Sequence, residues 1–130
     1  MNIRSLITLS LSLASLLVGA QPADDRYTVH FRTGTVTPEA NLSYFLTSYT
    51  PAKETIFSGQ FFQLIQFEEI PTDAIKQTLL QAGVTLLDYL PHRAWFAAFR
   101  EDFNREAITG AGIRSITGIR EEYKRSPLLY

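Results

Sequence analysis

Two apolar stretches separated by only three residues constrain the fold of this chain more than any other feature. The first, VTLLDYL, covers residues 84–90, and the second, AWFAAF, covers residues 94–99. Pro91 opens the linker between them, at the position where a tight turn accepts proline. The sequence therefore predicts a β-hairpin. Because side chains alternate along a strand, Trp95 and Phe99 should share one face of it, and Phe96 should lie on the other.

Two predicted elements precede the hairpin. Residues 60–68 (QFFQLIQFE) are almost continuously apolar, as is typical of a buried central strand. Residues 72–83 (TDAIKQTLLQAG) predict a helix. Thr72 can accept the free N–H groups at its start, and Gly83 suits the left-handed residue that follows its last turn.

Two further elements follow the hairpin. Residues 101–112 (EDFNREAITGAG) predict a short second helix, and residues 113–119 (IRSITGI) predict a last strand. Residues 60–119 then have the order strand, helix, strand, strand, helix, strand. This order predicts an α+β fold of the ferredoxin-like βαββαβ type, a four-stranded antiparallel sheet with two helices on one face.

A strand and a short helix precede this unit. Residues 27–33 (YTVHFRT) alternate between apolar and polar side chains and predict a half-buried strand. The helix should begin after Thr37, with Pro38 at its first position, and present Leu42 and Phe45 at helical spacing. This strand either extends the sheet or lies beside it. Asn41 also begins a glycosylation sequon, Asn-Leu-Ser.

The N-terminus has the pattern of a secretory signal peptide. Arg4 precedes an uncharged run of about 13 residues, and small residues at Gly19 and Ala20 follow. A membrane-spanning helix would need about 20 apolar residues, so we favour export with cleavage near Ala20 over a membrane anchor. The predicted protein is secreted or periplasmic. The predicted divisions are a signal peptide (1–20), an N-terminal strand and helix (21–59), the ferredoxin-like domain (60–119) and a C-terminal tail (120–130).

Composition argues against several functional classes. The 12 Lys and Arg residues include Arg4, which leaves 11 against 13 acidic residues after cleavage. This slight negative charge gives no basic patch for nucleic acid, and we expect no membrane contact after cleavage. The chain has no Cys, hence neither disulfides nor a thiol nucleophile. We therefore expect an apolar core to hold the domain together.

Few side chains are placed for catalysis. His30 lies on the polar side of a predicted strand and His92 at a turn, and neither belongs to a triad or metal-binding motif. Asp88 lies in mid-strand, either as a buried polar anchor or on the solvent side of an edge, and we favour the edge. We expect no enzyme activity, no metal and no cofactor.

Aromatic residues are too numerous in these strands to share one face. If helices cover one side of the sheet, the other side carries the remaining aromatics, and an exposed apolar face of this kind favours a protein partner. The alternative is that the first strand and its helix cover that face. The aromatic residues concerned are Phe61, Phe62, Phe67, Tyr89, Trp95, Phe96 and Phe99.

Several short motifs resemble the N-terminal region of secreted bacterial subtilisin-like serine peptidases. They are the aromatic-x-L-I-Q-F strand at 62–67, I-P-T at 70–72, A-G at 82–83, L-L-D-Y-L-P at 86–91 and the strand that starts at Ala94. The segment 32–41 (RTGTVTPEAN) also resembles the opening of that region. The peptidase motifs themselves, D-(S/T)-G, H-G-T-H and G-T-S-(M/A), do not occur in the sequence.

This resemblance implies a propeptide-like chaperone or inhibitor. In such regions an open sheet packs on two surface helices of the peptidase, and the C-terminal tail lies along the substrate cleft. The expected partner is a subtilisin-like serine peptidase, bound in cis or in trans, and the chain would be either part of a precursor or a stand-alone protein. The second hypothesis is an exported binding or self-associating module without a link to proteases. The candidate partner-binding residues are Tyr89, Trp95, Phe96, Phe99, Leu128, Leu129 and Tyr130.

Overall fold

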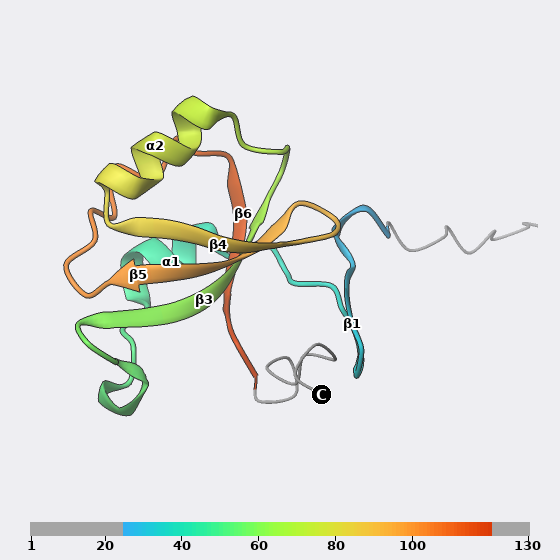
Figure 1. Cartoon of the computed structure of the whole chain (residues 1–130), viewed down its shortest axis with the longest axis horizontal. Helices are drawn as coiled ribbons and strands as arrows, with labels where there is room; N and C mark the ends of the chain where they lie inside the picture. The colour runs from blue at the N-terminus through green and yellow to red at the C-terminus, as the bar shows by residue number, and fades with distance from the viewer. Residues whose placement is uncertain (1–24, 121–130) are drawn as a thin grey trace, which may run out of the picture.

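The computed structural model describes residues 25–120 and is an α+β fold (Figure 1). It contains two α-helices, two short 3-10 helices (labelled η), a four-stranded antiparallel sheet and a separate two-stranded antiparallel sheet. The elements in chain order are η1 (Asp25–Tyr27), β1 (Val29–Phe31), β2 (Gly34–Val36), α1 (Leu42–Ser48), η2 (Lys53–Thr55), β3 (Gln60–Phe67), α2 (Asp73–Gln81), β4 (Val84–Leu90), β5 (Ala94–Arg100) and β6 (Ile113–Gly118).

The four-stranded sheet has the order β4-β5-β3-β6, and every neighbouring pair is antiparallel. The predicted hairpin is confirmed as β4 and β5, with Leu90 opposite Ala94 across the turn. The predicted central position of residues 60–68 is also confirmed, because β3 pairs with β5 on one side and with β6 on the other.

Helix α2 begins and ends as the sequence predicts. The Thr72 hydroxyl accepts a hydrogen bond from the Ile75 backbone N–H at 3.3 Å, which satisfies one free donor of the first turn. Gly83 follows the helix with a φ of +93°, and a Cβ at this position would approach Phe103 to 3.3 Å. A side chain at residue 83 would therefore be both strained and crowded.

The helix predicted at residues 101–112 is wrong, because this segment consists of turns. Tertiary contacts override its helical propensity. Phe103 and Ile108 are buried in the core. The Arg105 guanidinium donates to the carbonyl oxygens of Phe45 at 2.9 Å and Tyr49 at 2.8 Å, which lie at the C-terminal end of α1.

Helix α1 packs on the same side of the sheet as α2. Phe45 of α1 and Leu79 of α2 belong to one buried cluster together with Phe61 and Phe99 of the sheet. The N-terminal segment and the predicted ferredoxin-like domain thus share a single core. Figure 1 shows α1 behind β3 and β5 and α2 beside β4.

The predicted start of α1 after Thr37 is also wrong, since the helix begins at Leu42 with Asn41 as its N-cap residue. Asn41 does not cap α1 with its side chain. Its amide instead donates to the Ile116 carbonyl oxygen and accepts from the Ile116 N–H, both at 2.8 Å. The side chain of the sequon asparagine is thereby held against the outer edge of β6.

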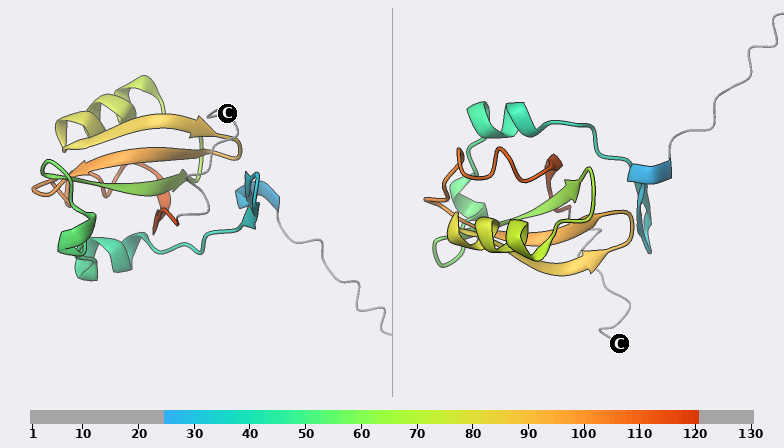
Figure 2. Two further views of the ribbon diagram at one scale, coloured as in Figure 1. Left: turned by 60° about the horizontal axis from the view of Figure 1, so that its bottom comes forward. Right: turned by 90° about the horizontal axis from the view of Figure 1, so that it is seen from above.

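The N-terminal strand lies beside the main sheet. It forms β1, which pairs with β2, a strand that the sequence did not predict. The predicted alternation is confirmed, because Val29 is buried whereas His30 and Arg32 are exposed. Figure 2 shows this small sheet at the end of the main sheet where the β4–β5 hairpin turns. Among residues 25–120, no helix is both long and apolar enough to cross a membrane.

Candidate protein-docking face

The two sides of the four-stranded sheet carry different sets of residues, fixed by the strand register. The helix-covered face includes Phe61 opposite Phe99 and Ile65 opposite Trp95. The other side, which we call the open face, is carried by β3, β5 and the adjoining strands. Its central residues are Phe62 opposite Ala98, Leu64 opposite Phe96 and Gln66 opposite Ala94.

The β1–β2 sheet covers one end of the open face. Val29 is fully buried and forms a small cluster with Leu64 and Ala94. Phe31 packs against Phe96, with 6.5 Å between the ring centroids. The alternative in which the first strand and its helix cover this side is therefore correct for the strand and wrong for the helix. β1 covers one end of the open face, while α1 lies on the opposite face.

A polar network holds the N-terminal segment in place. The Gln66 side chain is fully buried and donates to the backbone carbonyl oxygens of Tyr27 at 2.7 Å and His92 at 3.2 Å. It also accepts a hydrogen bond from Arg114 at 3.0 Å. The Arg114 guanidinium donates further to the Pro38 carbonyl oxygen and lies 4.1 Å from the centre of the Tyr27 ring. A buried amide with every partner supplied ties this segment to one position.

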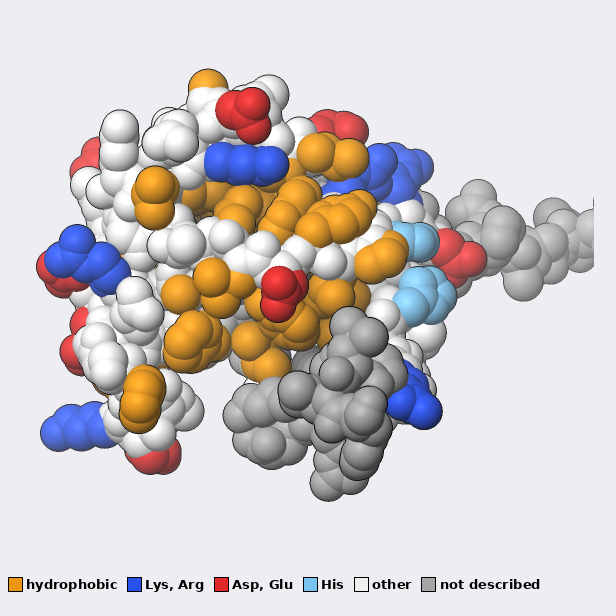
Figure 3. Space-filling model, viewed as in Figure 1, with side chains coloured by type: hydrophobic (Ala, Val, Ile, Leu, Met, Phe, Trp, Pro, Cys, Tyr) orange, Lys and Arg blue, Asp and Glu red, His pale blue; other side chains and the backbone are white. Residues whose placement is uncertain are grey.

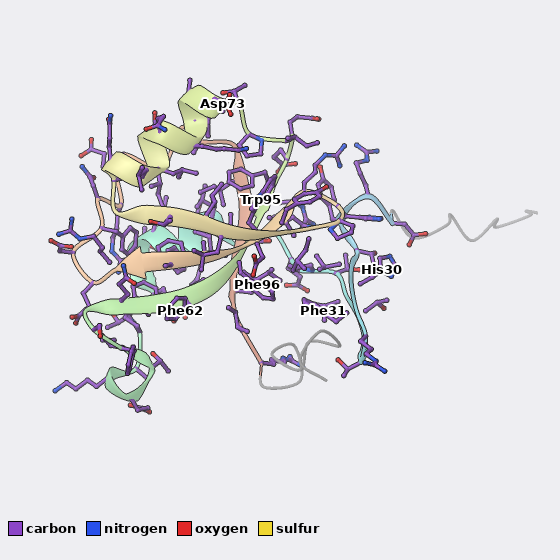
Figure 4. The ribbon with its side chains drawn as sticks, in the orientation of Figure 1. His30, Phe31, Phe62, Asp73, Trp95 and Phe96 are labelled. Atoms are coloured by element: carbon purple, nitrogen blue, oxygen red, sulfur yellow. The ribbon has the colours of Figure 1, made fainter. Side chains whose placement is uncertain are left out.

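The part of the open face that the β1–β2 sheet leaves uncovered among the described residues begins at Phe96 and carries exposed apolar side chains. Phe62 is 42% exposed and Phe96 is partly exposed. A register shift in β4 places Leu87 and Asp88 together opposite Phe96, and both are exposed. Figure 3 shows hydrophobic side chains gathered over this part of the sheet, and Figure 4 shows Phe62, Phe96 and Phe31 following one another toward β1. This arrangement can bind a partner by apolar contact.

The residues predicted to bind a partner differ in burial and in the face of the sheet on which they lie. Phe96 lies on the open face, whereas Trp95 and Phe99 are buried in the core beneath the helices. A docking role for Trp95 and Phe99 is therefore corrected to a packing role, since neither has surface to offer. Tyr89 is 52% exposed, although its ring packs on Trp95 at 4.7 Å between centroids, on the helix-covered side. Leu128, Leu129 and Tyr130 lie outside the described residues.

Two residues of the open face were missed by the sequence reasoning. Phe62 follows Phe61 directly, so the alternation that separates Trp95 from Phe96 also separates Phe61 from Phe62 and could have identified it. Leu87 could have been identified in the same way, because it alternates with Thr85, which lies opposite Ala98 on the open face. The register shift affects the facing of the residues after Leu87, and it becomes visible only when β4 is paired with β5.

The two histidines lie together at the hairpin turn. Their ring centroids are 5.2 Å apart, and Nδ1 of His92 lies 2.8 Å from the backbone oxygen of Asp25. Asp88 is exposed on the edge strand, as favoured from the sequence. Within residues 25–120, no group of three or more His, Cys, Asp or Glu side chains is placed to hold a metal ion.

One titratable group is shifted by its surroundings. The Tyr27 hydroxyl donates a hydrogen bond of 2.7 Å to the Glu68 carboxylate. This bond, together with desolvation and the negative charge of Glu68, raises the pKa of Tyr27 above its ordinary value of 10.0. The bond requires the protonated phenol, so Tyr27 acts as a structural contact between η1 and the end of β3.

Comparison with known proteins gives one match. Neither the curated proteins nor the solved structures contain a significant match to this chain. A family model does match residues 30–120, which is more than half of the sequence, and spans every strand of the main sheet and both helices. The family is described as "Domain of unknown function (DUF8729)". The chain therefore belongs to the DUF8729 family.

Proposed function

We propose that this protein is a secreted or periplasmic, propeptide-like domain that binds a subtilisin-like serine peptidase as a folding chaperone or inhibitor. The observation that carries the proposal is the open face, an apolar sheet surface opposite the helical layer, on which Phe62 is 42% exposed and Phe96, beside Phe31 of β1, is partly exposed. The sequence motifs at 62–72 and 86–91 supply the choice of partner, because they resemble the propeptide region of such peptidases.

We further propose that the fold is a variant of the ferredoxin-like sandwich. The strand order β4-β5-β3-β6, with every pair antiparallel, supports this reading. The departure is the second helix, which turns replace at residues 101–112. In the proposed variant α1, from before the unit, covers the part of the sheet that this helix would cover.

Binding in this proposal is non-covalent and depends on two aromatic anchors. Full burial of a wholly exposed phenylalanine contributes about 1.5–3 kcal/mol, and Phe62, which is 42% exposed in the free protein, would contribute part of this. Phe62 and Phe96 lie on neighbouring strands of the same face, so one partner helix can contact both. The exposed Asp88 beside Phe96 lies at the rim, where a charge affects the choice of partner more than the affinity.

The first experiment measures inhibition. The chain without residues 1–20 is added to a panel of subtilisin-like peptidases, and residual activity is followed together with recovery of activity after refolding. We expect inhibition or assisted refolding for at least one enzyme, weakened about tenfold or more by Phe62→Ala. Tyr44→Ala is the matched control, because Tyr44 is 64% exposed but belongs to α1 on the other side of the sheet.

Two results would count against the proposal. One is that no peptidase in the panel responds, either in inhibition or in refolding. The other is that Phe62→Ala and Tyr44→Ala weaken binding equally, which would move the contact away from the open face. A dimer in sedimentation that Phe62→Ala disrupts, without any response of the peptidases, would favour the self-associating module.

A further inference from the structure

The chain leaves the last strand of the main sheet on the open face. β6 runs antiparallel to β3, with Gly118 opposite Gln63, so continuing this register by one residue sets Ile119 opposite Phe62. Ile119 is partly buried and packs against the open-face cluster that contains Leu64. At residue 120 the described part of the chain is therefore close to the exposed ring of Phe62.

Exposed apolar side chains form a strip across the open face, from the end of β6 to β4. Phe62 of β3 is exposed, Phe96 of β5 is partly exposed, and Leu87 of β4, which lies opposite Phe96, is exposed. The strand order β4-β5-β3-β6 places β6 and β4 at the two ends of this strip. Because adjacent strands lie about 4.8 Å apart, the strip is about 14 Å long.

The sequence that follows has the composition to cover this strip. Residues 121–130, which lie outside the described residues, read EEYKRSPLLY. Two basic residues, Lys124 and Arg125, precede the apolar group PLLY at 127–130. A fully extended segment of this length spans about 33 Å, more than twice the length of the strip. The apolar group can therefore reach each exposed side chain of the strip, including after a turn at Pro127.

The open face also carries a charge that matches this segment. Asp88 is exposed next to Leu87 and forms no ion pair within residues 25–120. Lys124 and Arg125 are close enough in sequence to the apolar group for one of them to meet Asp88 while the leucines lie on the strip. An exposed pair of this kind adds little affinity, but it favours one orientation of the segment.

We propose that residues 121–130 of the same chain cover the exposed part of the open face. Leu128 and Leu129 contact Phe62 and Leu87, and a basic residue of the segment lies beside Asp88. The segment then occupies the surface that a peptidase would bind, and it must leave before the peptidase does so. As a control of peptidase binding this inference rests on the proposed function, whereas the docking itself is measured on the chain alone.

Tethering favours this segment over a second copy of the chain as the occupant. A short link holds two groups at an effective concentration in the millimolar range, about a thousandfold above a second copy at micromolar concentration. The link here starts at Ile119, which already packs on the open face. Weak apolar contacts are therefore sufficient for the segment to dock.

Disulfide trapping tests the docking, because the sequence contains no Cys and an introduced pair is the only one. Thr85 lies on β4 on the open face, opposite Ala98, and Ser126 directly precedes the apolar group. The chain without residues 1–20 receives Thr85→Cys and Ser126→Cys. We expect an intramolecular disulfide that forms at least tenfold faster than in the matched control, Tyr44→Cys with Ser126→Cys. Tyr44 is exposed on α1, on the other side of the sheet.

Substitutions that leave both cysteines in place test the proposed contacts. Leu128→Asp together with Leu129→Asp should slow the trapping about tenfold. Asp88→Lys should slow it about two- to fivefold, as expected for an exposed pair. Lys124→Asp with Arg125→Asp should restore the rate in the Asp88→Lys chain. Circular dichroism confirms that each variant is folded.

Control of peptidase binding is a separate measurement. For a peptidase that responds to the unsubstituted chain, the disulfide-locked form should bind at least tenfold more weakly, and a reductant should restore binding. Equal affinity of the locked and reduced forms would overturn the regulatory part of the proposal. If the disulfide forms and no peptidase responds to either form, the docking stands and the proposed function fails.

Two results would overturn the docking itself. One is trapping at equal rates with cysteines at positions 85 and 44. The other is a disulfide that forms only between chains, which would assign the open face to a second copy.

Discussion

The two faces of the main sheet are built from the same strands and yet differ in how they are covered. On the helix-covered face, Phe99 lies against Phe45, Phe61 and Phe103, with ring centroids 5.1–5.6 Å apart. On the open face, Val29 covers Leu64 and Ala94, and Phe62 remains 42% exposed. Alternation distributes apolar residues to both sides of β3 and β5, and coverage by other segments decides which of them become core.

Phe99→Ala should have the largest effect on stability, because Phe99 is fully buried in the core of the helix-covered face. Removing a buried aromatic ring and leaving a cavity costs about 3–5 kcal/mol. Urea denaturation should show a stability lower by this amount. A loss below about 1 kcal/mol would mean that the aromatic cluster is not the centre of the core.

Two buried glutamines on β3, one on each face of the sheet, allow the two faces to be compared directly. Gln66 points to the N-terminal segment and has partners for both its oxygen and its nitrogen, so Gln66→Met leaves buried polar groups without partners and should cost about 2–3 kcal/mol. Gln63 points to the helices; its side-chain nitrogen donates to the Tyr49 hydroxyl at 3.0 Å, but its oxygen accepts no hydrogen bond among the described residues. Gln63→Met should therefore change stability by less than about 1 kcal/mol.

The same two variants should differ in their amide hydrogen-exchange protection. Gln66→Met should lower the protection of residues 28–36, because it detaches the β1–β2 sheet from the open face. Gln63→Met should leave that protection unchanged. Equal exchange in the two variants would show that the Gln66 network does not hold β1 and β2 in place.

Phe62→Ser should lower stability by only about 1 kcal/mol, because the ring is 42% exposed and only its buried part loses apolar contact. In the peptidase assay the same variant should lose about tenfold or more in affinity. Thermal unfolding measured beside the binding assay checks both expectations. A large loss of stability would assign Phe62 to the core and remove it as an anchor.

The smallest effect concerns the Tyr27–Glu68 contact. Because the folded state raises the pKa of Tyr27, the stabilisation is fully present below the ordinary pKa of 10.0 and is lost as the pH rises through the raised value. Glu68→Ala should bring the pKa of Tyr27 back toward 10.0, as read from tyrosinate absorbance. Glu69→Ala, at the neighbouring position, should leave it unchanged.

Much of the architecture could be predicted from local patterns. Thr72 and Gly83 bound α2 because capping depends on neighbouring backbone groups alone. Phe96 and Trp95 were assigned to opposite faces because alternation is a property of the strand itself. The errors occurred where distant partners decide, as when Arg105 binds α1 instead of continuing a helix, or when Asn41 binds Ile116.

The sequence by itself determined the strands of the main sheet, the antiparallel hairpin and the division of aromatic residues between two faces, since these follow from side-chain periodicity and turn chemistry. Only the tertiary structure decided which face is covered, because coverage depends on where α1 and β1 pack after the chain has folded back. It also decided that Trp95 and Phe99 are core residues whereas Phe62 is exposed. Burial is a property of the assembled layers, and no single segment contains that information.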